Sequence, residues 1–235
     1  MWISSGSPVV AEIAGCAGFD WCLIDGEHGP NTLATMLPQL QALDAAGTQA
    51  VIRVAAPEVW MIKQALDLGC QTLLVPLVHD GDTATKIARA MRYPPEGIRG
   101  VGAAMARASR FGAVTNYVRA ANDQVCLLVQ AESAAALQNI DAIAATPGVD
   151  GVFVGPADLS ADMGYPGQLD HPEVVAAIDH MIARIVAAGK VAGIITFDDA
   201  RLKDYVQKGV TFLGVGGDNM VLRRGLEALL HTAKE

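Results

Sequence analysis

The chain has 235 residues, of which 51% are hydrophobic and 18% are charged, and its formal net charge is −8. This composition excludes an intrinsically disordered protein, which needs low hydrophobicity and high charge. The acidic balance, without any run of Lys or Arg, argues against a nucleic-acid partner. No stretch approaches the roughly 18 consecutive apolar residues of a membrane-spanning helix, and no signal peptide is visible, so we expect a cytoplasmic protein.

Short apolar runs rich in β-branched residues alternate with alanine-rich segments of helical spacing. Nearly continuous apolar runs are typical of parallel strands that are covered on both faces. The expected strands cover residues 1–4, 19–24, 49–54, 72–75, 125–130, 149–154, 191–196 and 210–215. The expected helices cover residues 8–16, 33–46, 58–68, 82–91, 134–145, 172–188, 198–208 and 219–233.

Eight strands alternating with eight helices predict an α/β protein, a single (β/α)8 TIM barrel over residues 1–235. A doubly wound open sheet is the alternative, but no G-x-G-x-x-G motif follows the first strand. Residues 93–112 form one long irregular segment, and loops of that length are usually functional. The first expected strand begins at Met1, so no helix precedes it to cap the bottom of the barrel. Either the sequence starts inside a longer product or another segment caps the barrel.

The four cysteines contain no C-x-x-C pair and lie in apolar surroundings. We expect buried free thiols rather than disulfides or a metal site. The positions are Cys16, Cys22, Cys70 and Cys126.

Catalytic residues of a barrel of this kind lie at the carboxyl ends of the strands. The second expected strand is followed by Asp25, Glu27 and His28. A histidine beside carboxylates can act as a general base, with one carboxylate fixing its tautomer. The structural alternative is a turn that Asp25 caps.

Arg53 ends the third strand, where it fits either a structural ion pair with a carboxylate such as Glu27 or stabilisation of an oxyanion.

Two further carboxylates, Glu132 and Asp158, follow the adjacent fifth and sixth strands. Two acidic side chains with water positions open suit a hard divalent ion such as Mg²⁺ or Mn²⁺ better than zinc. The alternative is that each carboxylate only caps the helix that follows it. The backbone N–H groups of Ala157 and Asp158 open a helix and can bind an anion, and residues 214–218 form a second, weaker turn of this type.

Other polar residues carry weaker signals. Asp67, near the end of the third helix, fits either a solvated helix residue or a supporting group from a neighbouring subunit. No lysine ends a strand in an apolar setting, which argues against a Schiff-base mechanism.

Several motifs together resemble the HpcH/HpaI aldolase family, in the branch of metal-dependent 4-hydroxy-2-oxoheptanedioate (hydroxyketoacid) aldolases. The resemblance covers essentially the whole chain, in order. The motifs are LIDGEHGP at residues 23–30, YPPEGIRGVG at 93–102, ARASR at 106–110, QAE at 130–132 and VGPADLS at 154–160. The chain departs from the family pattern at Gly29, Glu96 and Phe111, which lie at the pocket rim or in the long loop.

The resemblance implies a (β/α)8 barrel that assembles as a hexamer, a trimer of dimers, with the last helix exchanged between dimer partners. It also implies a class II pyruvate aldolase, which cleaves 4-hydroxy-2-oxo acids reversibly to pyruvate and an aldehyde through a metal-bound enolate. The metal would be Mg²⁺ or Mn²⁺, with Co²⁺ as a further option.

The same resemblance assigns roles to individual residues. Glu132 and Asp158 would bind the metal, and Gln130 would lie beside it. Arg53 would hold the keto oxygen of pyruvate and its enolate, and the N–H groups near Ala157 and Asp158 would meet the pyruvate carboxylate. His28 would transfer protons, with Asp25 and Asp67 in support.

Competing functions remain open at this stage. A malyl-CoA or citramalyl-CoA lyase on the same barrel would need basic residues at the rim for CoA, to which a charge of −8 gives little support. A 2-dehydro-3-deoxy-sugar-acid aldolase is a further alternative, and a non-catalytic assembly module would bind no metal.

Overall fold

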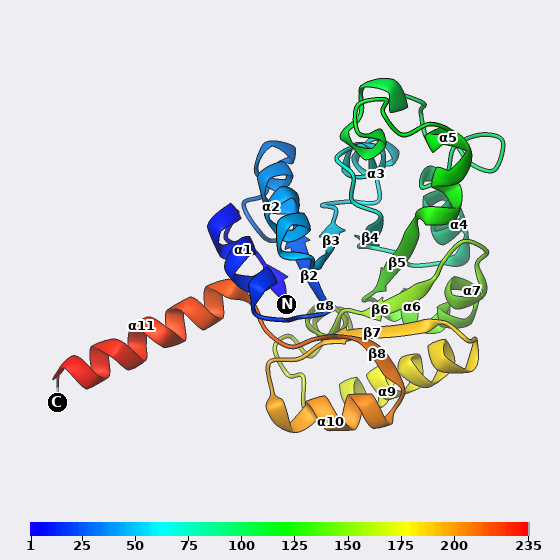
Figure 1. Cartoon of the computed structure of the whole chain (residues 1–235). Helices are drawn as coiled ribbons and strands as arrows, with labels where there is room; N and C mark the ends of the chain where they lie inside the picture. The colour runs from blue at the N-terminus through cyan, green and yellow to red at the C-terminus, as the bar shows by residue number, and fades with distance from the viewer. Residues whose placement is uncertain (235) are drawn as a thin grey trace.

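The computed structural model describes residues 1–234, in which eight parallel strands lie in sequence order around one sheet (Figure 1). The strands are β1 (Trp2–Ile3), β2 (Trp21–Asp25), β3 (Gln49–Arg53), β4 (Thr72–Val75), β5 (Cys126–Ala131), β6 (Gly151–Val154), β7 (Val191–Ile195) and β8 (Val210–Gly214). The N–H of Trp2 donates to the carbonyl of Gly216 at 2.9 Å, and Trp2 also bridges Gly217. These contacts join β1 to the segment after β8, so the sheet is a nearly closed barrel and the (β/α)8 prediction is confirmed.

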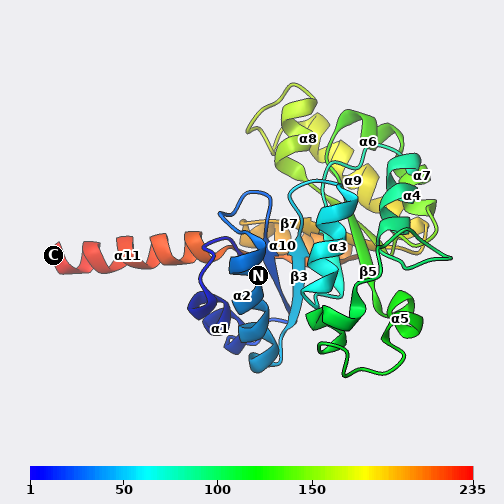
Figure 2. The same cartoon turned by 90° about the horizontal axis from the view of Figure 1, so that it is seen from above.

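Helices cover the outside of this sheet, as the view from above shows (Figure 2). The helices are α1 (Pro8–Cys16), α2 (Leu33–Ala46), α3 (Val59–Asp67), α4 (Gly81–Ala90), α5 (Tyr117–Ala120), α6 (Ala134–Gln138), α7 (Ile140–Ala145), α8 (Pro156–Asp162), α9 (Pro172–Ala187), α10 (Asp199–Gln207) and α11 (Asp218–Lys234). Local signals set their ends. Asp80, for example, caps α4 by accepting a hydrogen bond from the Thr83 N–H at 2.7 Å.

The structure corrects two expectations about local structure. The helix expected at 134–145 is divided into α6 and α7, because Asn139 leaves the helical conformation and its side chain donates to the carbonyls of His79 and Ala135. All four thiols are free, but Cys16 is exposed, so its expected burial is wrong. Cys16 lies on the face of α1 that also carries the exposed Val9 and Ile13.

The core has two layers, which follow from the two faces of the strands. Side chains on the outer face of the sheet pack against the helices. Alternate side chains point into the barrel, where they form a second cluster. The members of this inner cluster are Trp2, Leu23, Val51, Leu74, Leu128, Phe153 and Phe212.

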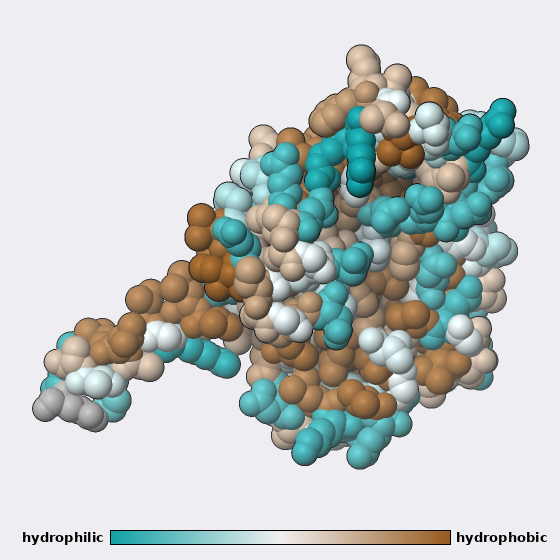
Figure 3. Space-filling model, in the orientation of Figure 1, coloured by the Kyte–Doolittle hydropathy of each residue, from teal (hydrophilic) through white to brown (hydrophobic). Residues whose placement is uncertain are grey.

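Helix α11 leaves the barrel body and extends away from it (Figures 1 and 2). Its apolar side chains are exposed in a single chain, including Leu222 at 59%, Leu226 at 58% and Leu229 at 70%. Figure 3 shows these hydrophobic side chains along the projecting helix. Within residues 1–234, no helix combines the length and the apolar character that crossing a bilayer demands.

Candidate active site

One layer of polar side chains lies directly above the inner apolar cluster. Asp25, Arg53 and Gln130 each follow a member of that cluster by two residues, so each points into the barrel. The strand register places Asp25 opposite Arg53. All three side chains are buried at the carboxyl ends of their strands.

The Arg53 guanidinium is the centre of a buried ion-pair network. Its Nε and Nη2 donate to Asp25 Oδ1 at 2.9 Å and Oδ2 at 2.7 Å, and its Nη1 lies 2.8 Å from Glu27 Oε2. The fork geometry of arginine allows this bidentate contact. Arg53 is therefore held rigidly by two carboxylates, and both the ion-pair and the oxyanion interpretations remain compatible with its position.

Asp25 also organises the turn after β2. Its Oδ1 accepts the backbone N–H groups of Glu27 at 3.0 Å and His28 at 3.3 Å, and Asn31 Nδ2 donates to its carbonyl. Burial raises the pKa of Asp25, but Arg53 and the two N–H groups outweigh it, so that pKa lies below its ordinary value. Asp25 thus fixes the backbone at His28. Within residues 1–234, no hydrogen bond joins the Asp25 side chain to the His28 ring.

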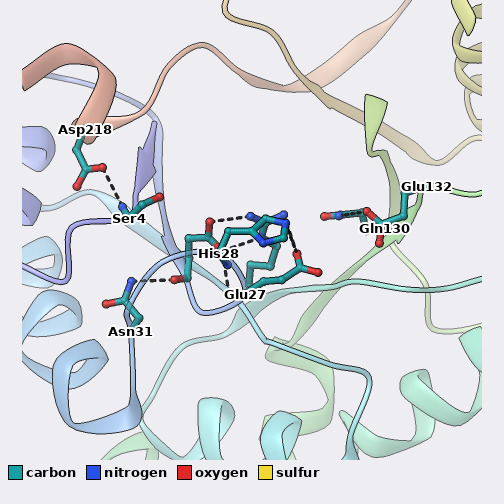
Figure 4. Close-up of polar contacts among 9 residues, drawn as sticks. Ser4, Glu27, His28, Asn31, Gln130, Glu132 and Asp218 are labelled. Carbon is teal, nitrogen blue, oxygen red and sulfur yellow. Dashed lines mark hydrogen bonds and ion pairs between the residues drawn. The ribbon is translucent and has the colours of Figure 1, made fainter. Parts of the chain in front are cut away.

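His28 and Glu27 lie side by side at the mouth of the barrel (Figure 4). The His28 side chain is 65% exposed, and its Nε2 lies 3.9 Å from Glu27 Oε2. Burial raises the pKa of Glu27, and the opposing charge of Arg53 offsets this only in part. The histidine ring is therefore accessible to a ligand, with a carboxylate beside it.

Glu132 is a buried carboxylate that has no cationic partner. It is 3% exposed, its Oε1 accepts the Leu77 N–H at 2.9 Å, and its Oε2 accepts from Gln130 Nε2 (Figure 4). No Lys, Arg or His of residues 1–234 forms an ion pair with it. Burial raises the pKa of Glu132, and the nearby charge of Asp158 adds to this effect. Leaving such a carboxylate ionised is costly unless a cation meets it.

The backbone at Gly155 packs closely against the Glu132 side chain. A Cβ at Gly155 would lie 2.7 Å from Glu132 Oε2 and 2.8 Å from its Cβ, so only glycine fits there. Gln130 Oε1 is buried and has no hydrogen-bond partner among the described residues. An oriented carboxylate and an unpaired amide oxygen are both ligands that hard cations prefer.

Asp158 lies in the first turn of α8 and is exposed. The helix is capped by Gly155 rather than by Asp158, and Ser133 rather than Glu132 caps α6. The capping explanation of both carboxylates is therefore wrong. Asp158 instead lines a cavity of about 610 Å³ at the carboxyl ends of the strands, together with Asp25, His28, Arg53 and Gln130.

The donor set formed by Glu132 and the adjoining cavity fits a divalent ion that keeps several water ligands. Residues 1–234 contain no cluster of three or more His, Cys, Asp or Glu side chains arranged for a metal. Glu132 and Asp158 supply two carboxylates, and Mg²⁺ is commonly bound through one or two carboxylates plus water and substrate oxygens. The site thus fits a hard cation and not a structural zinc ion.

Asp67 is the one predicted site residue that lies away from this cavity. It ends α3, and its Oδ1 accepts from Arg99 Nη2 at 2.6 Å, where Arg99 is 1% exposed. The helices run back along the strands, so the end of α3 lies toward the opposite rim. Within one chain Asp67 contacts none of the other predicted site residues.

Two residues at the site carry roles that the sequence patterns did not reveal. Leu77 adopts a left-handed backbone (φ 60) that directs its N–H at Glu132, which no sequence pattern signals. Asp218 is buried and accepts the N–H group of Ser4 at 2.9 Å (Figure 4). It also accepts the N–H groups of Ser5 at 3.0 Å and of Asn219 at 2.8 Å. A carboxylate therefore already occupies the turn at residues 214–218, which disfavours a phosphate there.

Comparisons with known proteins agree with this geometry. The sequence model of the HpcH/HpaI aldolase/citrate lyase family matches residues 1–225. A hydroxypyruvate/pyruvate aldolase from Agrobacterium fabrum is 53% identical over 97% of this chain and 86% of its own length. A 4-hydroxy-2-oxo-heptane-1,7-dioate aldolase from Shigella flexneri is 51% identical over 97% of this chain and 86% of its own length.

A solved structure shows the same fold. A protein of the HpcH/HpaI aldolase/citrate lyase family from Burkholderia cenocepacia superposes with a TM-score of 0.96 and 40% identity, covering 100% of this chain and 93% of that one. The curated homologues are aldolases, and aldolases are carbon–carbon lyases, which confirms the predicted enzyme class. The chain belongs to the HpcH/HpaI aldolase/citrate lyase family.

Proposed function

We propose that this chain is a metal-dependent pyruvate aldolase that cleaves 4-hydroxy-2-oxo acids reversibly to pyruvate and an aldehyde. The observation that carries the proposal is Glu132, a buried carboxylate without an ion-pair partner that accepts from Gln130, where Gln130 lines the cavity together with Arg53 and Asp158. The substrates in the names of the two aldolases above support the substrate class.

Glu132 and Asp158 would hold the divalent ion, with the buried Gln130 amide beside them. When bound, Mg²⁺, Mn²⁺ or Co²⁺ would supply Lewis-acid polarisation of the 2-oxo acid. The N–H groups of Ala157 and Asp158 in the first turn of α8 have no partner within the helix and would receive the pyruvate carboxylate.

Arg53 would hold the 2-oxo oxygen and stabilise the negative charge that grows on it in the enolate. Its fixed position between Asp25 and Glu27 means that little reorganisation is needed when this charge develops. His28 would remove the C3 proton of pyruvate and, in the cleavage direction, the proton of the C4 hydroxyl group. The exposed ring at the cavity supports this role.

The lining of the cavity also bears on two competing mechanisms. No lysine lines it in the part of the chain that the structure describes, which disfavours a Schiff base. The rim near α10 carries Asp170, Asp198 and Arg201, with more negative than positive charge, which disfavours the phosphates of CoA.

The quaternary structure and the location stay predictions. The exposed leucines of α11 and the exposed Val9 and Ile13 of α1 support burial of the helix against a second copy, as expected for exchange between dimer partners in a hexamer. Asp67 would then reach a neighbouring subunit's site. We also propose a cytoplasmic location.

Deuterium exchange tests the proposed function without knowledge of the aldehyde. Incubation with pyruvate and Mg²⁺ or Mn²⁺ in D₂O should replace the C3 protons, which ¹H NMR follows as loss of the methyl signal. Chelator or Glu132→Gln should abolish the exchange, and Asp141→Asn, an exposed carboxylate remote from the cavity on α7, should leave it unchanged. Full exchange in EDTA, or none in the wild type with metal, would refute the proposal.

A further inference from the structure

The two carboxylates proposed to hold the metal come from different elements of the barrel. Glu132 follows the last residue of β5, and Asp158 lies in the first turn of α8. No hydrogen bond joins their side chains within residues 1–234, and their like charges repel each other. A cation that both side chains bind needs a fixed distance between them. That distance must therefore come from contacts between β5 and α8 outside the two side chains.

Two hydrogen bonds hold α8 against the end of β5, one at each end of this helix. At its start, the N–H of Gly155 donates to the carbonyl of Ala131 at 3.1 Å. At its last residue, Asp162 Oδ2 accepts the N–H of Ala134 at 2.7 Å. Ala131 and Ala134 lie on either side of Glu132 in the chain. The helix is therefore attached to the backbone before and after this carboxylate, and Asp162 supplies the side chain of one of the two bonds.

The position of Asp162 on α8 explains why this bond affects Asp158. The two residues are four positions apart, so they project from the same face of the helix. Asp162 does not line the cavity at the strand ends. Its charge lies beside the free carbonyl groups at the end of α8, where a carboxylate is unfavourable. The N–H of Ala134 opens α6 and has no partner inside that helix, so the carboxylate stabilises the contact between α6 and α8 and not α8 itself.

The segment that Asp162 holds is itself fixed from the opposite side, by residues that follow β4. The Oγ of Ser133, the residue before Ala134, lies 2.8 Å from His79 Nδ1. The Asn139 side chain donates in turn to the His79 carbonyl at 3.1 Å. Ala134 is therefore anchored independently of α8, and its hydrogen bond to Asp162 fixes the end of α8 in place.

We propose that Asp162 is a positioning residue of the metal site, whose hydrogen bond to Ala134 sets the separation between the Glu132 and Asp158 carboxylates. It acts through the backbone of α8 and touches neither the cation nor the substrate. The proposal rests on the proposed function, because it takes these two carboxylates as the metal ligands. Loss of the bond leaves both carboxylates present but lets the distance between them vary, which lowers the affinity for the cation.

Two substitutions at Asp162 separate the effect of position from the effect of charge. Asp162→Asn removes the negative charge but keeps a side-chain oxygen that can accept the Ala134 N–H, whereas Asp162→Ala removes both. In calorimetry, Asp162→Ala should weaken Mn²⁺ binding about tenfold, as expected for loss of a residue that supports a metal ligand. Asp162→Asn should stay within about twofold of the wild type, because the hydrogen bond remains. In the metal-free protein, NMR should show faster amide exchange at Ala134 in Asp162→Ala but not in Asp162→Asn.

The matched control is Asp150→Ala, because Asp150 Oδ2 accepts the N–H of Leu127 at the same 2.7 Å, but near the amino end of β5. This variant should leave Mn²⁺ affinity unchanged. Unchanged affinity in Asp162→Ala, equal weakening in Asp162→Asn and Asp162→Ala, or an equal loss in Asp150→Ala would overturn the proposal. If the wild type then still binds Mn²⁺ and exchanges the pyruvate C3 protons, the positioning role has failed while the proposed function stands. A wild type that does neither refutes both.

Discussion

Replacement of Arg53 by methionine should destabilise the protein strongly, because it leaves two carboxylates inside the barrel without their cation. The guanidinium makes two hydrogen bonds to Asp25, which is 2% exposed, and a third close contact to Glu27. Removal of one partner from a buried ion pair costs about 3–5 kcal/mol. Arg53→Lys keeps the charge but cannot form the bidentate contact, so it should lose at least one charge-assisted hydrogen bond, about 1.5–3 kcal/mol.

Urea unfolding at a fixed protein concentration, in EDTA and at neutral pH, measures these losses. The double variant Arg53→Met with Asp25→Asn should recover part of the lost stability, since the orphaned charge is gone. The pKa of Asp25 is lowered in the folded state, so the stabilisation is present above the ordinary pKa of aspartate and disappears as the pH falls through the folded value. The difference between wild type and Arg53→Met should therefore shrink in acid. A loss under 1 kcal/mol at neutral pH, or purely additive effects in the double variant, would refute the reasoning.

Two further predictions concern the carboxylate site, and a third concerns Arg53. Gly155→Ala forces a methyl group against Glu132, so it should lower the free energy of unfolding by about 1–3 kcal/mol and weaken Mn²⁺ binding in calorimetry. Gly102→Ala, which meets open space, should leave Mn²⁺ binding unchanged. Equal Mn²⁺ affinity in the two variants would contradict this prediction. Glu132→Gln should raise the melting temperature of the metal-free protein, because the raised pKa of Glu132 marks an unfavourable buried charge, and a lower melting temperature would count against that view. Arg53→Ala should slow pyruvate C3 exchange by about 100-fold, near 3 kcal/mol, and near-normal exchange would remove Arg53 from the reaction.

The sequence predicted the barrel because its apolar runs are short, continuous and regularly alternated with helical segments. The same periodicity placed Asp25, Arg53, Gln130 and Glu132 at strand ends, where the structure has them. The pairing of Arg53 with Asp25 needs the register of β2 and β3, which spacing along the chain does not contain.

Other features depend on contacts that no local pattern encodes. The Leu77 N–H reaches Glu132 only because a left-handed backbone turns it there, and the break at Asn139 depends on a hydrogen bond to His79 across 60 positions. Asp67 faces Arg99 in a single chain, so its expected support of a neighbouring site depends on how subunits assemble.

Titration with Mn²⁺, followed by electron paramagnetic resonance, tests the central claim most directly. The wild type should bind one Mn²⁺ ion per chain, and both Glu132→Gln and Asp158→Asn should lose this binding. Asp170→Asn, which removes a carboxylate from the same cavity but not from the proposed metal site, should keep it. Undiminished Mn²⁺ binding by the Glu132→Gln and Asp158→Asn variants would contradict the account.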